Sequence, residues 1–210
     1  LYGTGGENLG GHFYAAPLNE LISQSTLTNS VILAQDPNKG FIAPASVFRK
    51  SNGVFDIYIQ SFGGVVQKIN GENLAPQWTY TKPNTESSAA PVIGNFVGDL
   101  TPDVLLVLFK GEASSYSDFY QIVLDGATGN VEFIDSIGSI HFASANAVDL
   151  NNDGRDEGVF ALSYMENSCF RSRVIAVDFT SNTVTNLDAT RTGVNIGSTP
   201  QILDLDNNGL

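Results

Sequence analysis

One nine-residue turn holds the side chains of this sequence that are best suited to bind an ion. It runs from Asp149 to Glu157 and reads Asp-Leu-Asn-Asn-Asp-Gly-Arg-Asp-Glu. Oxygen-bearing side chains stand at positions 1, 3, 5 and 9, a glycine at position 6 permits a sharp turn, and the carbonyl at position 7 is a further donor. Three carboxylates supply the charge. The sequence therefore predicts a calcium site formed by Asp149, Asn151, Asp153, the carbonyl of Arg155 and Glu157.

An EF-hand loop and a metal-free Asx-turn are two other structures for a turn of this sequence. An EF-hand loop would place a glutamate at position 12, where this chain has Phe160, and would lie between helices rather than strands. The EF-hand is therefore excluded. The second is an Asx-turn, in which the same side chains hydrogen-bond the backbone of the turn without a metal ion.

A further copy of the motif stands at the end of the sequence. Its donors would be Asp204, Asp206, Asn208 and the carbonyl of Leu210, and the sequence stops before its ninth position. We expect calcium here in the intact protein, although a loop without its ninth position is also consistent with an empty site.

Two earlier copies of the turn have lost their ligands. One has Val97 at position 3, and the other has Phe48 and Lys50 at positions 1 and 3, where an ammonium group would repel a cation. Both keep an acid at position 9, which is Asp56 in one and Asp103 in the other. We expect these two carboxylates to hydrogen-bond the backbone of their turns.

The turn recurs as part of a longer repeat. Its copies begin at Phe48, Asn95, Asp149 and Asp204, which lie 47, 54 and 55 positions apart. Short segments rich in Val, Ile, Phe and Tyr flank each turn and are separated by Gly, Asn, Asp and Pro, as is typical of strands. Four strands per repeat is the composition of a β-propeller blade. The sequence predicts an all-β propeller, with an all-β sandwich as the competing fold.

The predicted propeller is an incomplete arc of three complete blades and parts of two others. It is completed by the rest of a longer protein or by another chain, because closed propellers have typically 4–8 blades. A single helical turn is expected near residues 17–24. The predicted units are 1–38 (outer strands of a preceding blade), 39–84 and 85–140 (blades with degenerate turns), 141–193 (the blade with the intact turn) and 194–210 (the first strand and truncated turn of the next blade).

The turn and the blade outline resemble the FG-GAP repeat, found in the propeller of integrin α-subunits and in many bacterial surface proteins. In that family Asp-x-Asp/Asn-x-Asp-Gly-x-x-Asp connects the first two strands of a blade and holds calcium. Here Glu157 replaces the last aspartate and keeps the carboxylate. The resemblance implies a calcium-stabilised propeller at the cell surface.

A second resemblance is to the PQQ-like repeat of quinoproteins, carried by residues 69–80 and 124–133. A quinone site needs a broad aromatic floor, and Trp78 is the single tryptophan, so we expect it to pack between blades. The glycines of residues 3–11 do not fit a phosphate loop. His12 and His141 are isolated in the sequence and are interpreted as structural.

The composition excludes several classes of partner. The 22 acidic and 10 basic residues give a net charge of −12, whereas nucleic acids and anionic membranes select clustered Lys and Arg. The longest apolar run is far shorter than the roughly 20 residues of a membrane helix. The single Cys169 indicates either a half-buried residue or a disulfide to a cysteine outside this segment.

We expect a non-enzymatic binding or adhesion module in an extracellular, cell-surface or periplasmic location, with Ca²⁺ as its only cofactor. Its partner would be a protein or glycan at the cell surface, or neighbouring copies in an assembly. Two alternatives stay open. One is a structural subunit of a surface filament or sheath, and the other is a propeller enzyme (a quinoprotein, lyase or hydrolase) whose active site lies outside this segment.

Overall fold

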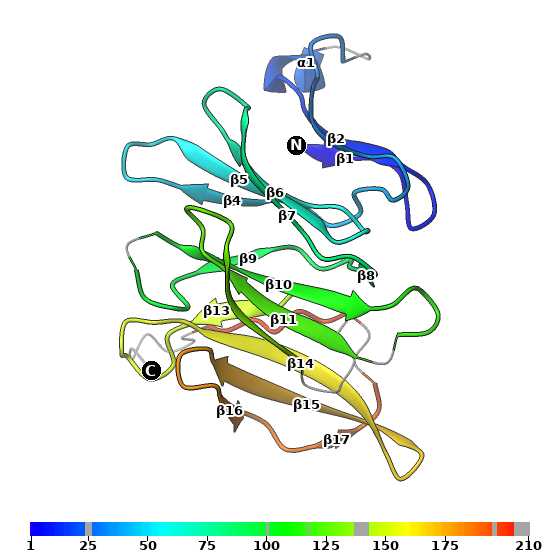
Figure 1. The fold of residues 1–210 in the computed structure, drawn as a ribbon, viewed down its shortest axis with the longest axis vertical. Coiled ribbons are helices and arrows are strands. Elements are labelled where there is room, and N and C mark those ends of the chain that lie inside the picture. Colours follow the sequence, from blue (N-terminus) through cyan, green and yellow to red (C-terminus); the bar gives the residue numbers. More distant parts are fainter. Residues whose placement is uncertain (24–26, 100, 117, 137–142, 195–196, 204–210) are drawn as a thin grey trace.

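The fold is known from a computed structural model, which describes residues 1–23, 27–99, 101–116, 118–136, 143–194 and 197–203. These residues form four antiparallel sheets and the short helix α1 (Leu18–Ser23), so the all-β prediction is confirmed (Figure 1). No helix in the described ranges has both the length and the apolar character needed to cross a membrane.

The N-terminal sheet has three strands in the order β1-β2-β3, and α1 lies between its second and third strands. The next sheet, the first-repeat sheet, is a meander in the order β4-β5-β6-β7. The bounds are β1 (Tyr2–Gly3), β2 (Gly11–Ala15), β3 (Val31–Asp36), β4 (Ser46–Arg49), β5 (Phe55–Gln60), β6 (Val65–Asn70) and β7 (Pro76–Thr81).

The second-repeat sheet has the order β12-β11-β10, and both β8 and β9 pair with the free edge of β10. The third-repeat sheet has the order β13-β14-β15-β16, with β17 also on β15. The bounds are β8 (Thr85–Glu86), β9 (Val92–Gly94), β10 (Asp103–Lys110), β11 (Phe119–Leu124), β12 (Val131–Ser136), β13 (Asn146–Val148), β14 (Glu157–Glu166), β15 (Cys169–Asp178), β16 (Thr183–Asn186) and β17 (Arg191–Thr192).

Strand β10 shows why the sheets stack. It is an apolar run, and alternate side chains of a strand point to opposite faces of its sheet. Leu106 belongs to the core shared with Tyr58 of the first-repeat sheet, whereas Val107 belongs to the core shared with Phe160 of the third-repeat sheet. A strand that is apolar on both faces has to be covered on both faces, so each repeat packs between its neighbours.

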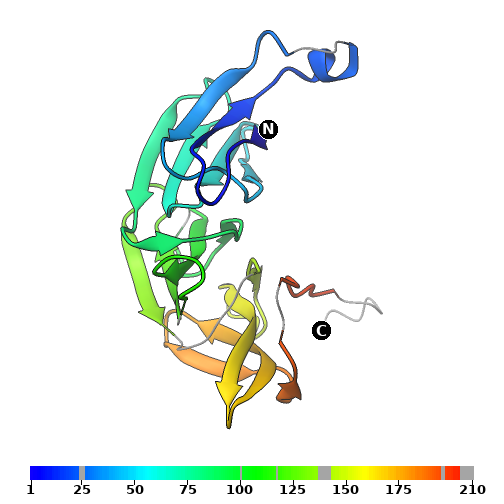
Figure 2. The same ribbon diagram turned by 90° about the vertical axis from the view of Figure 1, so that its right-hand side faces the viewer.

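The four sheets follow one another along a curve, with the N-terminal sheet at one end and the third-repeat sheet at the other (Figure 2). Strands β4, β9 and β13, the first strands of the three repeats, lie beside one another on this curve. The outer strands β12 and β16 are largely exposed. The first strands of the three repeats therefore lie along one edge of the stack, and the exposed strands β12 and β16 lie at the other edges of their sheets.

Candidate calcium turn

The third-repeat turn (residues 149–157) connects β13 to β14. The antiparallel pairing places Val148 opposite Glu157, so the residues between them form a loop whose first and ninth positions lie close together. Asn152 and Gly154 both have left-handed backbones, with φ of 60° and 87°. Glycine adopts this conformation without a steric penalty, which explains its place at position 6.

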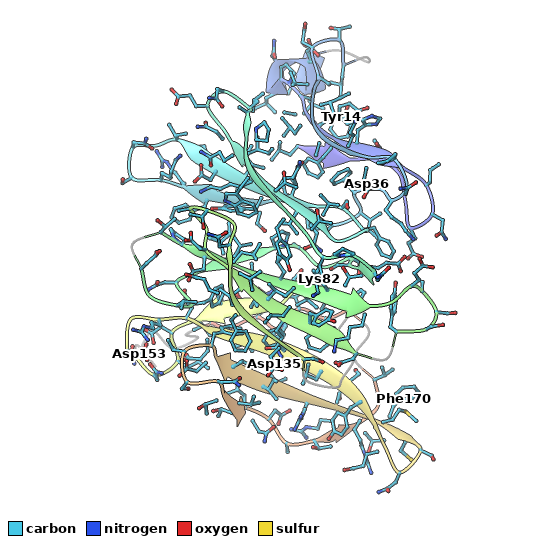
Figure 3. The ribbon with its side chains drawn as sticks, viewed as in Figure 1. Tyr14, Asp36, Lys82, Asp135, Asp153 and Phe170 are labelled. Carbon is cyan, nitrogen blue, oxygen red and sulfur yellow. The ribbon has the colours of Figure 1, made fainter. Side chains whose placement is uncertain are left out.

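The carboxylate of Asp149 faces back into the loop. Its Oδ1 accepts a hydrogen bond from the backbone N–H of Asp153 (3.2 Å) and its Oδ2 accepts one from that of Gly154 (2.9 Å). Asp153 in turn accepts from the N–H of Arg155 (2.9 Å). These bonds fix the first half of the turn, and Asp153 lies at its exposed tip (Figure 3).

Asn151 and Glu157 close the second half of the turn. Glu157 is only 7% exposed, and its Oε2 accepts from the backbone N–H of Leu150 (2.7 Å). The amide Nδ2 of Asn151 donates to Glu157 Oε1 (3.0 Å) and to Asp153 Oδ2 (3.2 Å). One amide therefore bridges two carboxylates inside the loop.

The structure brings together the four side chains that the sequence predicts as calcium ligands, and it holds them in the hydrogen-bonded arrangement of an Asx-turn. Among the described residues, no group of three or more His, Cys, Asp and Glu side chains is arranged to hold a metal ion. The donor chemistry nevertheless fits Ca²⁺. A rotation of the Asn151 side-chain amide by half a turn would place its oxygen, in place of its nitrogen, between the carboxylates of Asp153 and Glu157.

Acidic side chains outnumber basic ones by four to one in this turn. Within the described part of the chain, no Lys, Arg or His forms an ion pair with Asp149, Asp153 or Glu157. Asp149, Asp153 and Glu157 are three of the four carboxylates in this short loop. Like charges at this separation repel one another, so a bound cation would stabilise the turn.

In the first-repeat turn (residues 48–56), two lysines balance the charge of the carboxylate at position 9. The ammonium group of Lys50 lies 2.9 Å from one carboxylate oxygen of Asp56, and that of Lys68 lies 3.1 Å from the other. Lys68 is buried, donates to the carbonyl of Gly126 (2.7 Å) and lies over the ring of Tyr58. Asp56 is therefore held by two lysines, and the expectation that it would bind the turn backbone is wrong.

The second-repeat turn (residues 95–103) has neither a lysine nor a complete set of ligands. Asp103 Oδ2 accepts from the backbone N–H groups of Phe96 (3.0 Å) and Val97 (2.9 Å), so the role predicted for this residue is confirmed. Burial raises the pKa of the Asp103 carboxyl above its ordinary value, against the opposite effect of these two hydrogen bonds.

The third-repeat turn also contacts the second-repeat turn through a residue that the sequence did not single out. Asp156 Oδ2 accepts from the N–H of Asn95 (2.7 Å), and the N–H of Asp156 donates to the carbonyl of Asn95 (2.8 Å). The amide of Asn95 donates to the carbonyl of Gly154 (2.6 Å). The two turns lie on the same side of the stack, so ordering one would help to order the other (Figure 1).

The remaining candidate residues add little chemistry. The fourth turn, with Asp204, Asp206, Asn208 and Leu210, lies outside the described residues, as does His141. His12 packs against Tyr14, with ring centroids 5.7 Å apart. Cys169 is exposed rather than half-buried.

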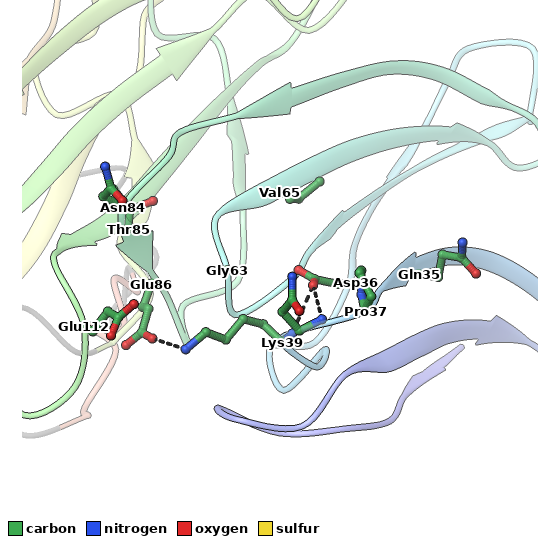
Figure 4. Close-up of a pocket in the computed structure, with 11 residues that line it drawn as sticks. Gln35, Asp36, Pro37, Lys39, Gly63, Val65, Asn84, Thr85, Glu86 and Glu112 are labelled. Atoms are coloured by element: carbon green, nitrogen blue, oxygen red, sulfur yellow. Dashed lines mark hydrogen bonds and ion pairs between the residues drawn. The ribbon is translucent and has the colours of Figure 1, made fainter.

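A separate pocket of about 480 Å³ lies on a different part of the stack, beside β8 (Figure 4). Its most buried charged group is Glu86, which forms an ion pair of 2.5 Å with Lys39. Glu86 also accepts hydrogen bonds from the N–H of Ala113 (2.8 Å) and the hydroxyl of Tyr116. The chain itself satisfies this carboxylate, so Glu86 is not a charged group in need of a ligand.

The sequence matches no protein-family model and no curated protein. The resemblance to FG-GAP repeats accordingly rests on two features, the residues of the turn and the outline of the repeat. Both are properties of this chain, and each can be tested on it directly.

Proposed function

We propose that the chain is an arc of a β-propeller. Three features support this arrangement: the four-stranded meander of each repeat, the apolar cores between successive sheets, and the contact among β4, β9 and β13. The first strands lie beside one another and the outer strands β12 and β16 are largely exposed, which favours radial repetition around an axis.

Within this arc the third-repeat turn binds Ca²⁺. The observation that carries this proposal is the contrast between two equivalent carboxylates: Asp56 is neutralised by Lys50 and Lys68, whereas Glu157 lies among other carboxylates with no such partner among the described residues. Asp149, Asn151, Asp153 and Glu157 would hold the ion with the carbonyl of Arg155. The ion would supply the positive charge that links β13 to β14.

A calcium-stabilised arc of this kind serves best as a non-enzymatic binding or adhesion module outside the cytoplasm. Surface loops of extracellular modules bind calcium with dissociation constants of roughly 10⁻⁴–10⁻³ M, which suits a compartment with millimolar Ca²⁺. The FG-GAP resemblance supports a protein or glycan partner at the cell surface. A structural subunit of an assembly is the second candidate, because the sheets at both ends of the stack expose apolar side chains.

Thermal unfolding in calcium and in EDTA tests the metal site. A ligand that binds only the folded state, at a free concentration of about ten to a hundred times its dissociation constant, raises the free energy of unfolding by about 1.4–2.7 kcal/mol. For a chain of this size we expect calcium to raise Tm by roughly 3–10 °C. Equal Tm values in calcium and EDTA would contradict the proposal.

A pair of matched variants assigns the effect to the turn. Glu157→Gln removes the carboxylate at position 9 of the third-repeat turn and should abolish most of the calcium response. Asp103→Asn makes the same change at position 9 of the second-repeat turn and should leave the response intact. Calorimetric titration of both variants with CaCl₂ provides the direct measurement, and a response lost in Asp103→Asn alone would place the ion elsewhere.

A further inference from the structure

The outward face of the third-repeat sheet carries a hollow of about 350 Å³. Its lining includes Leu150, Asn151 and Glu157 of the third-repeat turn and continues over Ala176, Thr185 and Leu187. Ala176 and Thr185 pair directly across β15 and β16, so they lie on one face of the sheet. Leu187 is 44% exposed. This face is the counterpart of the faces that the other repeats cover with a neighbouring sheet.

The interface between the second-repeat and third-repeat sheets shows how such a hollow is filled. Phe179 follows the last residue of β15 and inserts against the second-repeat sheet, with its ring 5.4 Å from that of Phe96 and 5.0 Å from that of Phe133. Phe96 is at position 2 of its turn, as Leu150 is. Phe133 lies on the fourth strand of its sheet at the place that Thr185 takes in the third repeat. The filling residue comes from the connection between the third and fourth strands of the next sheet.

The N-terminal sheet has unusual exposed apolar residues in that same connection. Between β2 and β3, which correspond to the third and fourth strands of a repeat, the chain forms α1 in place of a tight turn. Leu21 and Ile22 of this helix are 53% and 78% exposed. Glu20 anchors the helix, because its carboxylate accepts hydrogen bonds from the N–H groups of Thr28 and Asn29 (3.0 and 3.1 Å). Helix α1 lies at the end of the stack farthest from the third-repeat sheet (Figure 2).

Among the described residues, no sheet covers the outward face of the N-terminal sheet. Phe13 points into the core shared with the first-repeat sheet, so the alternate residues of β2 point away from it. Tyr14 lies on that outward side, stacks on Tyr2 at a centroid distance of 5.0 Å, and pairs with Ile32, which is largely exposed. This face could therefore cover a sheet as the other faces of the stack do.

We propose that the N-terminal sheet of one copy, led by α1, docks on the outward face of the third-repeat sheet of a second copy. Leu21 and Ile22 would enter the hollow bounded by Leu150 and Leu187, as Phe179 enters its counterpart within the chain. The contact continues the face-to-face stacking of the molecule. It joins two different surfaces, so association is head-to-tail and each dimer keeps one free face of each kind.

The hollow shares Leu150, Asn151 and Glu157 with the third-repeat turn. The association is therefore measured separately from calcium binding. It is tested by sedimentation velocity across a wide range of protein concentration, in EDTA and in calcium. We expect species larger than the monomer that grow with concentration in both buffers. A monomer at every concentration would overturn the proposal and leave the calcium site untouched.

Two surface variants establish the direction of the contact. Ile22→Arg blocks the face that carries α1, and Leu187→Arg blocks the hollow. Each should weaken self-association by about tenfold or more, since charge replaces a central apolar contact. An equimolar mixture keeps one complete interface, so we expect a discrete dimer with one copy of each variant. The control Val131→Arg lies on the exposed outer strand β12 and should associate like the parent chain.

The mixture separates head-to-tail docking from other contacts. If the two variants stay monomeric when mixed, the two faces do not bind each other and the proposal is wrong. If only Ile22→Arg abolishes association, the contact is a symmetric one between two N-terminal sheets, which also contradicts it. Circular dichroism of each variant checks that the sheets remain folded.

Discussion

The first-repeat and third-repeat turns occupy equivalent places between the first two strands of their sheets, yet their electrostatics are opposite. In the first, two ammonium groups lie within 2.9 and 3.1 Å of the Asp56 carboxylate. In the third, Glu157 shares one amide with Asp153, and no ion pair reaches either among the described residues. A repeat can thus neutralise its ninth position with a side chain of its own or leave it for an ion from solution.

Removing the Asp56 carboxylate should have the largest effect. Asp56→Asn leaves the buried Lys68 ammonium without its anion, and breaking one side of a buried pair costs about 3–5 kcal/mol. Urea unfolding in EDTA measures the loss, which should not change when calcium is added. Glu72→Gln, an exposed carboxylate on the adjacent turn, is the control. A loss as small as that of the control would mean that Lys68 is satisfied by the carbonyl of Gly126 alone.

Transferring the lysine to the third-repeat turn should have an intermediate effect. Asn151→Lys places an ammonium group at position 3, as Lys50 is placed in the first repeat. We expect the calcium increment of about 1.4–2.7 kcal/mol to disappear. Because the site is near the surface, the new charge should add at most about 1 kcal/mol in EDTA. Thermal unfolding with calcium measures the loss of the calcium increment, and unfolding in EDTA measures the contribution of the new charge. A retained calcium response would show that the two turns are not interchangeable.

The second-repeat turn should give the smallest effect, and one that depends on pH. The raised pKa of Asp103 means that the folded state holds a proton where the unfolded state has released it. The free energy of unfolding therefore falls as pH rises from the ordinary aspartate value of 3.8 through the raised one. Asp103→Asn removes this contribution, so the variant should gain stability relative to the parent chain over that range. Urea titrations at several pH values test it, and parallel pH curves would refute it.

The strand content and the turn residues could be predicted from the sequence because both are local. Alternating apolar runs and turn-forming residues predict strands wherever they occur, and the ligands of one loop lie within nine residues. Asp103 was predicted correctly for this reason, since its partners Phe96 and Val97 belong to its own turn. Helix α1 was also predicted from a single stretch, near residues 17–24.

The contacts that depend on register could not be predicted. Lys68 reaches Asp56 because β5 and β6 pair with Tyr58 opposite Lys68, a choice that no single segment determines. Asp156 contacts Asn95 across two sheets, at a separation of 61 residues. The same limit applies to the hollow at Leu187, which exists only after the sheets have stacked. The sequence pattern predicts which secondary structure a segment forms. The partners of its charged side chains depend on how the strands and sheets pack.

The position of Trp78 determines what tryptophan fluorescence can report for this chain. Its indole N–H donates to the carbonyl of Gly126 (3.1 Å), and its ring lies against Gly129, so it is enclosed between the first-repeat and second-repeat sheets. The emission of this single fluorophore will follow the separation of that one pair of sheets. Melting of the third-repeat sheet could proceed without a spectral change, and a lag between fluorescence and far-ultraviolet dichroism would reveal that the stack unfolds one repeat at a time.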